Sequence, residues 1–339
     1  MAPNRWLGGG KKSPIFPQIS AFLNSELPLE RLPLIGGGGS SFDPAQQLRR
    51  LSDNTQENTR RVRIMMQRML QSAPGVLPPM AEELRVKEDG CLRFLSLNMA
   101  HGRSDAPHQV FLRRSQVESH VAEIAATIQQ ANADIVGLQE ADGPSAWSGN
   151  FDHVDTLAAA TGLTSSFRGD HNPFRIGPLN VEAGTALVAR WPLVERQSLP
   201  FGSNWRDTKG FVVAAVDVPA WGITVDVVSL HLDFLRPTLR RQQIRTLIEE
   251  LQSRDRPRVV MGDLNCSVHL EPQSMRLLFS ELDLAAWAPH TLAPTFPSHK
   301  PRFRLDWILA SKAFEFAAHH TVATRLSDHL GVVADLRLR

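Results

Sequence analysis

Short apolar runs separated by polar turns dominate the chain from residue 91 onward. The runs expected to form strands are 94–97, 135–138, 186–189, 211–218, 223–230, 259–261, 305–309 and 332–338. Two other stretches repeat their apolar residues every three or four positions, which is the period of an α-helix. These apolar residues are Val117, Val121, Ile124, Ala125 and Ile128 in the first stretch, and Ile244, Leu247, Ile248 and Leu251 in the second. Many strands with few interposed helices predict an α/β fold in which two packed sheets are flanked by helices.

The first 90 residues have a different pattern. Residues 1–42 are rich in Gly, Pro and Ser, and they predict a flexible leader. Residues 43–90 predict a helical extension and linker, because Asp43 followed by Pro44 is typical of a helix start and a Pro/Gly-rich stretch closes the segment. The predicted helix carries a Met-rich stripe opposite several arginines. Such a helix either packs on its own domain or binds a partner or a membrane surface.

Composition sets limits on the class of protein. The 339 residues are 42% apolar, enough to bury a large core, and the formal net charge is only +2. No apolar window approaches the roughly 18 residues of a membrane span, and the N-terminus lacks the apolar core of a signal peptide, so we expect a cytoplasmic protein. The two cysteines, Cys91 and Cys266, have no CxxC spacing and predict neither a disulfide framework nor a zinc site.

Polar residues with catalytic potential lie inside or just beyond several of the predicted strands. They are Asn98, Glu140, His231, Asp263, Asn265 and Asp306, joined near the end of the chain by the adjacent pair Asp328 and His329. Taken singly, each is equally explained as a cap, a turn residue or a structural side chain. Taken together, they can converge on one sheet edge, and this pattern indicates a metal-assisted hydrolytic site.

The residue types suit phosphoester chemistry. Glu140 and Asn98 offer the carboxylate and amide oxygens that Mg²⁺ prefers. Asp263 and Asn265 are two positions apart, so in extended backbone both point to the same side. A carboxylate that accepts a proton from water, beside an amide that donates to a phosphate oxygen, suits hydrolysis of a phosphoester.

Two histidines add to this site. His231 ends an apolar run and can donate to a phosphate oxygen or protonate a leaving alkoxide. Asp306 lies among large apolar residues, where a carboxylate needs a partner, and His329 is its natural one. Such a pair would fix the tautomer of the imidazole, and Asp328 could then contact the metal or its waters.

The constellation resembles the endonuclease/exonuclease/phosphatase superfamily, which includes deoxyribonuclease I-like nucleases. The resemblance covers about residues 91–339, and its motifs occur in the order of the superfamily. These motifs are Leu97-Asn98, Leu138-Gln139-Glu140, Leu230-His231-Leu232, Gly262-Asp263-Leu264-Asn265, Arg304-Leu305-Asp306-Trp307-Ile308 and Ser327-Asp328-His329. The resemblance implies a four-layer α/β sandwich, with two packed and mainly antiparallel sheets between helices, as the catalytic domain.

The resemblance also implies a role for each matched residue. Asn98 and Glu140 would hold Mg²⁺ or Mn²⁺, with Asp328 assisting at the metal. Asp263 would activate or orient the attacking water, and Asn265 and His231 would bind the phosphate. Asp306 would hold His329 against the developing oxyanion. We therefore expect catalytic roles for His231, Asp263, Asn265, Asp306 and His329.

Several departures narrow the choice of subfamily. Cys266 and Ser267 follow the Gly-Asp-x-Asn motif, where inositol 5-phosphatases have an aromatic residue and Arg. Lys209-Gly210 is similar to the strand entry of sphingomyelinases, although Asp207 stands at a different spacing from the Asp of their Asp/Lys pair. The chain looks most like generic bacterial metal-dependent hydrolases of this superfamily.

Four residues are candidates for binding the substrate. His171 and Arg175 lie in a predicted loop, Arg302 lies in another basic loop, and Lys209 precedes the strand of His231. Cations in such loops can clamp a phosphate, although an ordinary solvated loop has the same composition. The substrate is expected to be a nucleic acid or a phospholipid head group.

These observations predict a divalent-metal-dependent phosphoester hydrolase, with a phosphodiesterase as the expected activity. One alternative is a sphingomyelinase-like enzyme acting on phospholipids. The alternative of another class is a non-catalytic binding scaffold with the same fold. Loss of Asp263 or His329 would be the signature of such a scaffold, and both residues are present.

Overall fold

The computed structural model describes residues 86–339, except for 105, 107, 172–173, 177–178, 203–208 and 323–325, and it describes residues 174–176 and 179 by their backbone alone. The predicted leader and almost all of the predicted helical extension lie outside the described residues. In the described part, no helix is both long and apolar enough to span a membrane.

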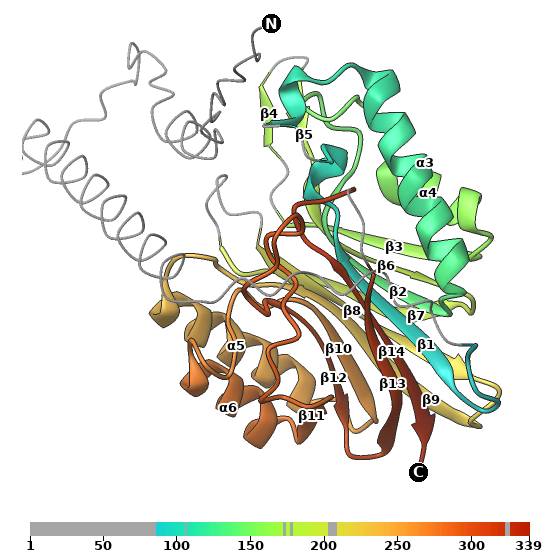
Figure 1. Cartoon of the computed structure of the whole chain (residues 1–339), viewed down its shortest axis with the longest axis vertical. Helices are drawn as coiled ribbons and strands as arrows, with labels where there is room; N and C mark the ends of the chain where they lie inside the picture. Colours follow the sequence, from blue (N-terminus) through green and yellow to red (C-terminus); the bar gives the residue numbers. More distant parts are fainter. Residues whose placement is uncertain are drawn as a thin grey trace, which may run out of the picture. The chain divides into compact units, whose positions relative to one another are not determined.

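Two six-stranded sheets form the centre of the domain (Figure 1). The first has the order β13 (Phe314–Val322), β14 (Gly331–Leu338), β1 (Leu92–Asn98), β2 (Ile135–Asp142), β6 (Ala183–Ala189) and β3 (Ser165–Asp170). The second has the order β11 (Leu284–Ala286), β12 (Asp306–Ser311), β10 (Arg258–Asp263), β9 (Ile223–His231), β8 (Gly210–Val218) and β7 (Leu193–Pro200). Neighbouring strands are antiparallel, except that β1 and β2 are parallel and so are β9 and β10. A separate hairpin joins β4 (Phe174–Ile176) and β5 (Leu179–Val181).

Helices cover the outer face of each sheet, as Figure 1 shows. The helices α3 (Arg114–Ala131) and α4 (His153–Thr161) pack on the first sheet, whereas α5 (Pro237–Gln252) and α6 (Pro272–Glu281) pack on the second. Three apolar layers result, one between the sheets and one beneath each helical pair. The predicted four-layer sandwich is confirmed.

All eight predicted strands are present, as β1, β2, β6, β8, β9, β10, β12 and β14, and the two predicted helices are α3 and α5. The sequence analysis missed α4, α6, the small hairpin and the strands β3, β7, β11 and β13. These last four are the outermost strands of the two sheets. An edge strand is open on one side and carries polar residues, as in β7, where five consecutive residues from Val194 to Ser198 are exposed. Such a strand has no continuous apolar run to reveal it.

Buried hydrogen bonds join the two sheets near one end. The hydroxyl of Ser229 in β9 donates to the carbonyl of Leu138 in β2 at 2.8 Å, and Gln139 Nε2 donates to Ser229 Oγ at 3.0 Å. The strands approach closely here, because a Cβ on Gly137 would lie only 3.2 Å from the side chain of Met261. The distance between β2 and β9 is therefore fixed one or two residues before Glu140 and His231.

A buried ion pair links β1 and β14. Arg93 and Asp335 are direct partners in the ladder, with Nε 2.6 Å from Oδ1 and Nη2 2.7 Å from Oδ2. Nη1 of Arg93 also donates to the carbonyl of Ala131 at the end of α3, at 2.9 Å. Both charged side chains are almost fully buried, so each depends on the other for its compensation.

Arg93→Met should strand the Asp335 carboxylate in the core and lower the free energy of unfolding by about 3–5 kcal/mol. Urea unfolding followed by circular dichroism measures this loss. Arg114→Ala is the matched control, because Arg114 forms an exposed pair with Glu118 that should contribute only about 0.3–0.5 kcal/mol. The double variant Arg93→Met/Asp335→Leu should recover most of the loss. An equal loss of unfolding free energy in Arg93→Met and Arg114→Ala would contradict this account.

Candidate active site

Strand register gathers the candidate residues at one end of the two sheets. Asp263 ends β10, with His231 of β9 beside it in the parallel ladder and Asp306 of β12 beside it in the antiparallel ladder. From the facing sheet, Asn98 at the end of β1 donates its Nδ2 hydrogen to Asp263 Oδ2 at 3.2 Å. The two sheets thus meet at the carboxylate of Asp263.

Asp263 is the centre of this arrangement and is 1% exposed. Its Oδ2 lies 3.3 Å from His231 Nε2 and 3.8 Å from His329 Nε2, and its Oδ1 accepts the backbone N–H of Asn265 at 3.0 Å. Burial alone would raise the pKa of Asp263, but the positive charge of His329 and the contact with His231 lower it to about 2. The carboxylate is therefore ionised and able to accept a proton at neutral pH.

Asp306 and His329 form the predicted pair, with His329 Nδ1 2.9 Å from Asp306 Oδ2. Burial would lower the pKa of His329, but the facing carboxylates of Asp306 and Asp263 raise it to about 10. Nδ1 is engaged by Asp306, so the ring points Nε2 toward Asp263. Asp263, Asp306 and His329 also form, among the described residues, a buried cluster compact enough to hold a metal ion.

Glu140 lies within β2, and not directly beyond the strand as the sequence suggested. It is the unpaired residue of a β-bulge between Gln139 and Ala141, with a φ of 50°. Its carboxylate lies 3.4 Å from His101 Nε2 and 3.8 Å from Lys209 Nζ. Burial would raise the pKa of Glu140, but His101 and Lys209 hold it well below its usual range. A strained residue in a bulge is typical of functional sites.

The oxygen atoms available here suit a hard divalent cation. Glu140 offers a partly exposed, ionised carboxylate, and Asn98 offers an amide oxygen that accepts the N–H of Ala100 at 3.0 Å and keeps a second lone pair. This donor set fits Mg²⁺ or Mn²⁺. Asp328 forms an ion pair with Arg103 at 2.5 Å, so its contact with a metal stays a prediction.

His231 is flanked by Lys209, whose Nζ lies 2.6 Å from its Nε2. Burial and the charge of Lys209 lower the pKa of His231, so the ring is neutral near pH 7. Asn265 has a φ of 49° and donates from Nδ2 to the carbonyl of Leu232 at 3.0 Å. Lys209, His231 and Asn265 thus line the side of the site next to Asp263.

The three remaining predicted residues have different outcomes. His171 follows β3 in a loop, as predicted, but it is only 3% exposed and its Nε2 lies 2.8 Å from Thr185 Oγ1, so its role at the substrate stays a prediction. Its ring packs where Gly210 leaves room, since a Cβ there would lie 2.6 Å from the ring, and burial lowers the pKa of His171 to about 3. Arg175 belongs to β4, of which only the backbone is described. Arg302 is half-buried, and its role at the substrate stays a prediction.

The sequence did not identify His101 and Asp142, which extend the site on the side of Glu140. His101 contacts Glu140 and places Nδ1 2.7 Å from Asp142 Oδ1. Burial would lower the pKa of His101, but Asp142 and Glu140 raise it. A signal existed in the chain, since Asp142 is two positions beyond Glu140 and His101 three beyond Asn98. Neither belongs to the motifs on which the prediction was based.

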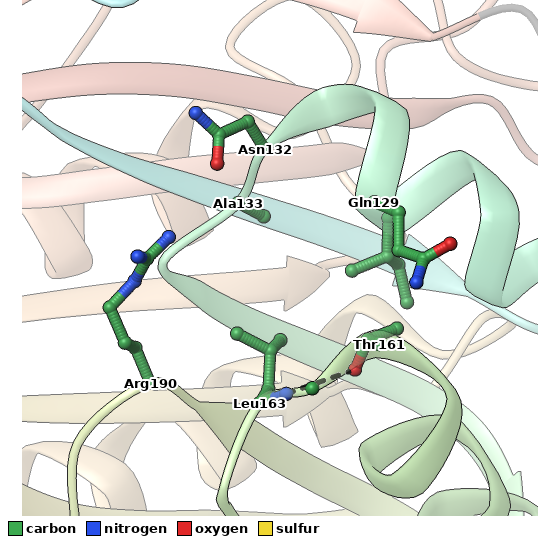
Figure 2. A pocket seen from close by; sticks show the side chains of 8 residues that line it. Gln129, Asn132, Ala133, Thr161, Leu163 and Arg190 are labelled. Carbon is green, nitrogen blue, oxygen red and sulfur yellow. Dashed lines mark hydrogen bonds between the residues drawn. The ribbon is translucent and has the colours of Figure 1, made fainter.

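A pocket of about 270 Å³ lies elsewhere on the domain (Figure 2). It is lined by Ile128, Gln129, Asn132, Ala133, Thr161, Gly162, Leu163 and Arg190. Asn132 and Ala133 precede β2, whereas Glu140 is near the other end of that strand, so the pocket and the gathered residues lie at opposite ends of the first sheet. It contains none of the predicted catalytic residues.

Comparison with known proteins agrees with the geometry. The profile of the endonuclease/exonuclease/phosphatase family matches residues 95–329, which include the whole gathered set. The chain belongs to the endonuclease/exonuclease/phosphatase family. The resemblance found in the sequence is thereby confirmed. No curated protein matches the chain.

Several solved structures share the fold. A family member from Beutenbergia cavernae is 26% identical, with a TM-score of 0.56 over 73% of this chain and 72% of its own. Sphingomyelinase C from Streptomyces griseocarneus is 20% identical, with a TM-score of 0.53 over 72% of this chain and 99% of its own. A mannosyl-6-phosphatase from Bacteroides thetaiotaomicron is 14% identical, with a TM-score of 0.56 over 72% of this chain and 99% of its own. The last two likenesses concern the fold alone.

The raised pKa of His329 predicts a titration that can be measured without substrate. We expect the imidazole to stay doubly protonated from pH 6 to pH 9, since its pKa is about 10. Because this pKa lies above the ordinary value near 6.5, the pairing stabilises the fold fully below about pH 6.5, and that contribution is lost as pH rises through about 10. Asp306→Asn should lower the pKa of His329 by more than about one unit.

Nitrogen-15 NMR of the imidazoles in metal-free protein measures this change, with His120 on α3 as the internal control. A pKa of His329 that is the same in both proteins would show that Asp306 does not set its charge.

Proposed function

We propose that this protein is a divalent-metal-dependent phosphodiesterase that hydrolyses its substrate by in-line attack of water. The observation that carries the proposal is the carboxylate of Asp263, which is ionised, buried between two imidazoles and hydrogen-bonded by the amide nitrogen of Asn98. Family membership supports the broader class, because the family and its structural neighbours are mostly hydrolases of phosphoester bonds.

In this proposal Glu140 and Asn98 would hold Mg²⁺ or Mn²⁺, and Asp328 would assist at the metal. When bound, the ion neutralises charge on the phosphate and polarises a phosphoryl oxygen. Glu140 is suited to this role because its lowered pKa keeps it ionised over the whole physiological range.

The chain supplies the proton transfers. Asp263 accepts a proton from water and orients its oxygen toward phosphorus, which is possible because the carboxylate is ionised at neutral pH. Asn265 and the neutral His231 hold the phosphate, with Lys209 adding positive charge beside them. His329, oriented by Asp306, donates through Nε2–H to the oxygen on which charge develops. No covalent intermediate with the protein is needed.

The substrate class has two candidates. The near-neutral charge of the domain does not favour a long polyanion, since residues 91–339 contain 25 basic and 26 acidic residues. The resemblance of Lys209-Gly210 to the strand entry of sphingomyelinases supports the alternative in which the diester belongs to a phospholipid head group. The fold likeness to Streptomyces griseocarneus sphingomyelinase C is consistent with this alternative.

Glu140→Ala, Asp263→Ala and His329→Ala should each lower kcat for a generic phosphodiester such as bis-p-nitrophenyl phosphate by about 10²–10⁴-fold. Initial rates with Mg²⁺, together with thermal unfolding of each variant, measure the effect. Arg114→Ala, on the exposed face of α3, is the control and should keep full activity. Wild-type turnover in all three variants would overturn the assignment of this site, and a lack of turnover by the wild-type protein itself would favour the non-catalytic scaffold.

Removal of the metal should abolish the same activity. Dialysis against EDTA should reduce turnover to background, and Mg²⁺ or Mn²⁺ should restore it in the wild-type protein but much less in Glu140→Ala. The restored enzyme is then assayed on sphingomyelin vesicles, single- and double-stranded DNA, RNA and a phosphomonoester, with His329→Ala as the blank. Hydrolysis of the monoester alone would overturn the assignment as a diesterase.

A further inference from the structure

A second carboxylate–imidazole pair faces the site from the first sheet. Asp142 Oδ1 lies 2.7 Å from His101 Nδ1, and this pair is the counterpart of the one formed by Asp306 of β12 and His329 of the loop before β14. Both aspartates are at most 1% exposed. The proposed roles described above leave the His101 imidazole without a function in catalysis.

The ring of His101 is held in one orientation. Trp147 donates from Nε1 to the second oxygen of Asp142 at 2.7 Å, so both oxygens of this carboxylate are engaged. The ring of Trp147 meets the ring of His101 at 62°, with centroids 5.2 Å apart. Asp142 and Trp147 together fix the imidazole in position, as second-layer carboxylates do for histidines at metal sites.

The backbone at His101 has an unfavourable conformation that its surroundings impose. Ala100 and His101 have φ values of 48° and 54°, in the left-handed region that non-glycine residues rarely adopt. Asn98 accepts the N–H of Ala100 on one side, and His120 of α3 contacts the carbonyl of Gly102 at 2.9 Å on the other. Strain of this kind persists where the surrounding structure imposes it, and it is concentrated at functional sites.

The remaining ring nitrogen points into the site. With Nδ1 engaged by Asp142, Nε2 faces the Glu140 carboxylate at 3.4 Å, and the His101 side chain is 14% exposed. A phosphate next to a cation held by Glu140 comes within reach of this nitrogen. We propose that His101 is a further catalytic residue, which donates its Nε2 hydrogen to a non-bridging phosphoryl oxygen on the Glu140 side of the substrate. His101, in the loop after β1, and His329, in the loop before β14, then both hold the phosphoryl group.

This inference rests on the proposed function, because it needs a phosphoryl group at the site. Its chemistry is electrostatic: no bond is made or broken at His101, and the hydrogen bond strengthens as negative charge accumulates on the phosphoryl oxygens. Asp142 and Trp147 are positioning residues in this scheme, since they act through His101.

Two variants of similar shape separate a contact with substrate from a structural role. His101→Asn keeps a donor close to the position of Nδ1 and so retains the bond to Asp142, but it has no group at the position of Nε2. His101→Gln reaches the position of Nε2 and keeps a donor that faces the site, but it gives up the bond to Asp142. His101→Ala removes both.

We expect kcat/KM for the diester to fall about 10²-fold in His101→Ala and in His101→Asn, and clearly less in His101→Gln. The inhibition constant of inorganic phosphate should rise about tenfold in the Asn variant, since a donor to the anion is lost. Thermal unfolding should order the variants differently, with the Asn variant closest to wild type. His108→Ala, in the same loop, is the control and should leave kcat/KM and the inhibition constant unchanged.

The proposal is overturned if the Asn variant retains as much kcat/KM as the Gln variant, because His101 would then act only through its bond to Asp142. Failure of the proposed function gives a different result. In that case Glu140→Ala and His329→Ala also retain full turnover, whereas failure of the His101 inference alone leaves those two variants inactive.

Discussion

The buried hydrogen bonds between Ser229, Gln139 and the carbonyl of Leu138 fix how closely β2 and β9 approach. Everything at the site depends on that distance, because Glu140 is carried by one sheet and His231 and Asp263 by the other. A polar contact inside an apolar layer is specific in a way that packing is not, since an unpaired hydroxyl or amide there is costly. The residues of the first sheet that face the proposed metal and those of the second sheet that face the phosphate are thus held in a fixed relation by three buried side-chain and backbone groups.

Much of the fold could be predicted from the sequence because the inner strands are buried on both faces. β8 lies between two apolar layers and therefore contains the continuous apolar run from Phe211 to Val216. The same reasoning fails at the sheet margins, because most residues of β7 and β13 are exposed or only partly buried and need no such run. The pattern of apolar residues along a sequence reflects burial. An edge strand depends mainly on its hydrogen bonds to the neighbouring strand, and the apolar pattern does not show these.

The site residues also differ in whether the sequence could predict them. Asp263, Asp306 and His329 could be predicted because each stands at or near the end of an apolar run and belongs to a motif of the family. His101 and Asp142 could not, because their importance depends on a contact between β2 and the loop after β1 that forms only in the folded chain. The burial of His171 could not be predicted either. The sequence placed the residue in a loop, but it does not reveal that the bare backbone of Gly210 creates a space into which the ring folds.

The bulge at Glu140 places one extra residue in β2. The ladder between β2 and β6 pairs Gln139 with Thr185 and Ala141 with Gly184, so its successive partners follow one another as if Glu140 were not there. The residue proposed to hold the metal is thus an extra residue that has no partner in the ladder. A chain that lost this single position would have a regular ladder, with the left-handed backbone of Glu140 removed. The ladder does not need this residue, and the proposed chemistry of the site would account for its presence.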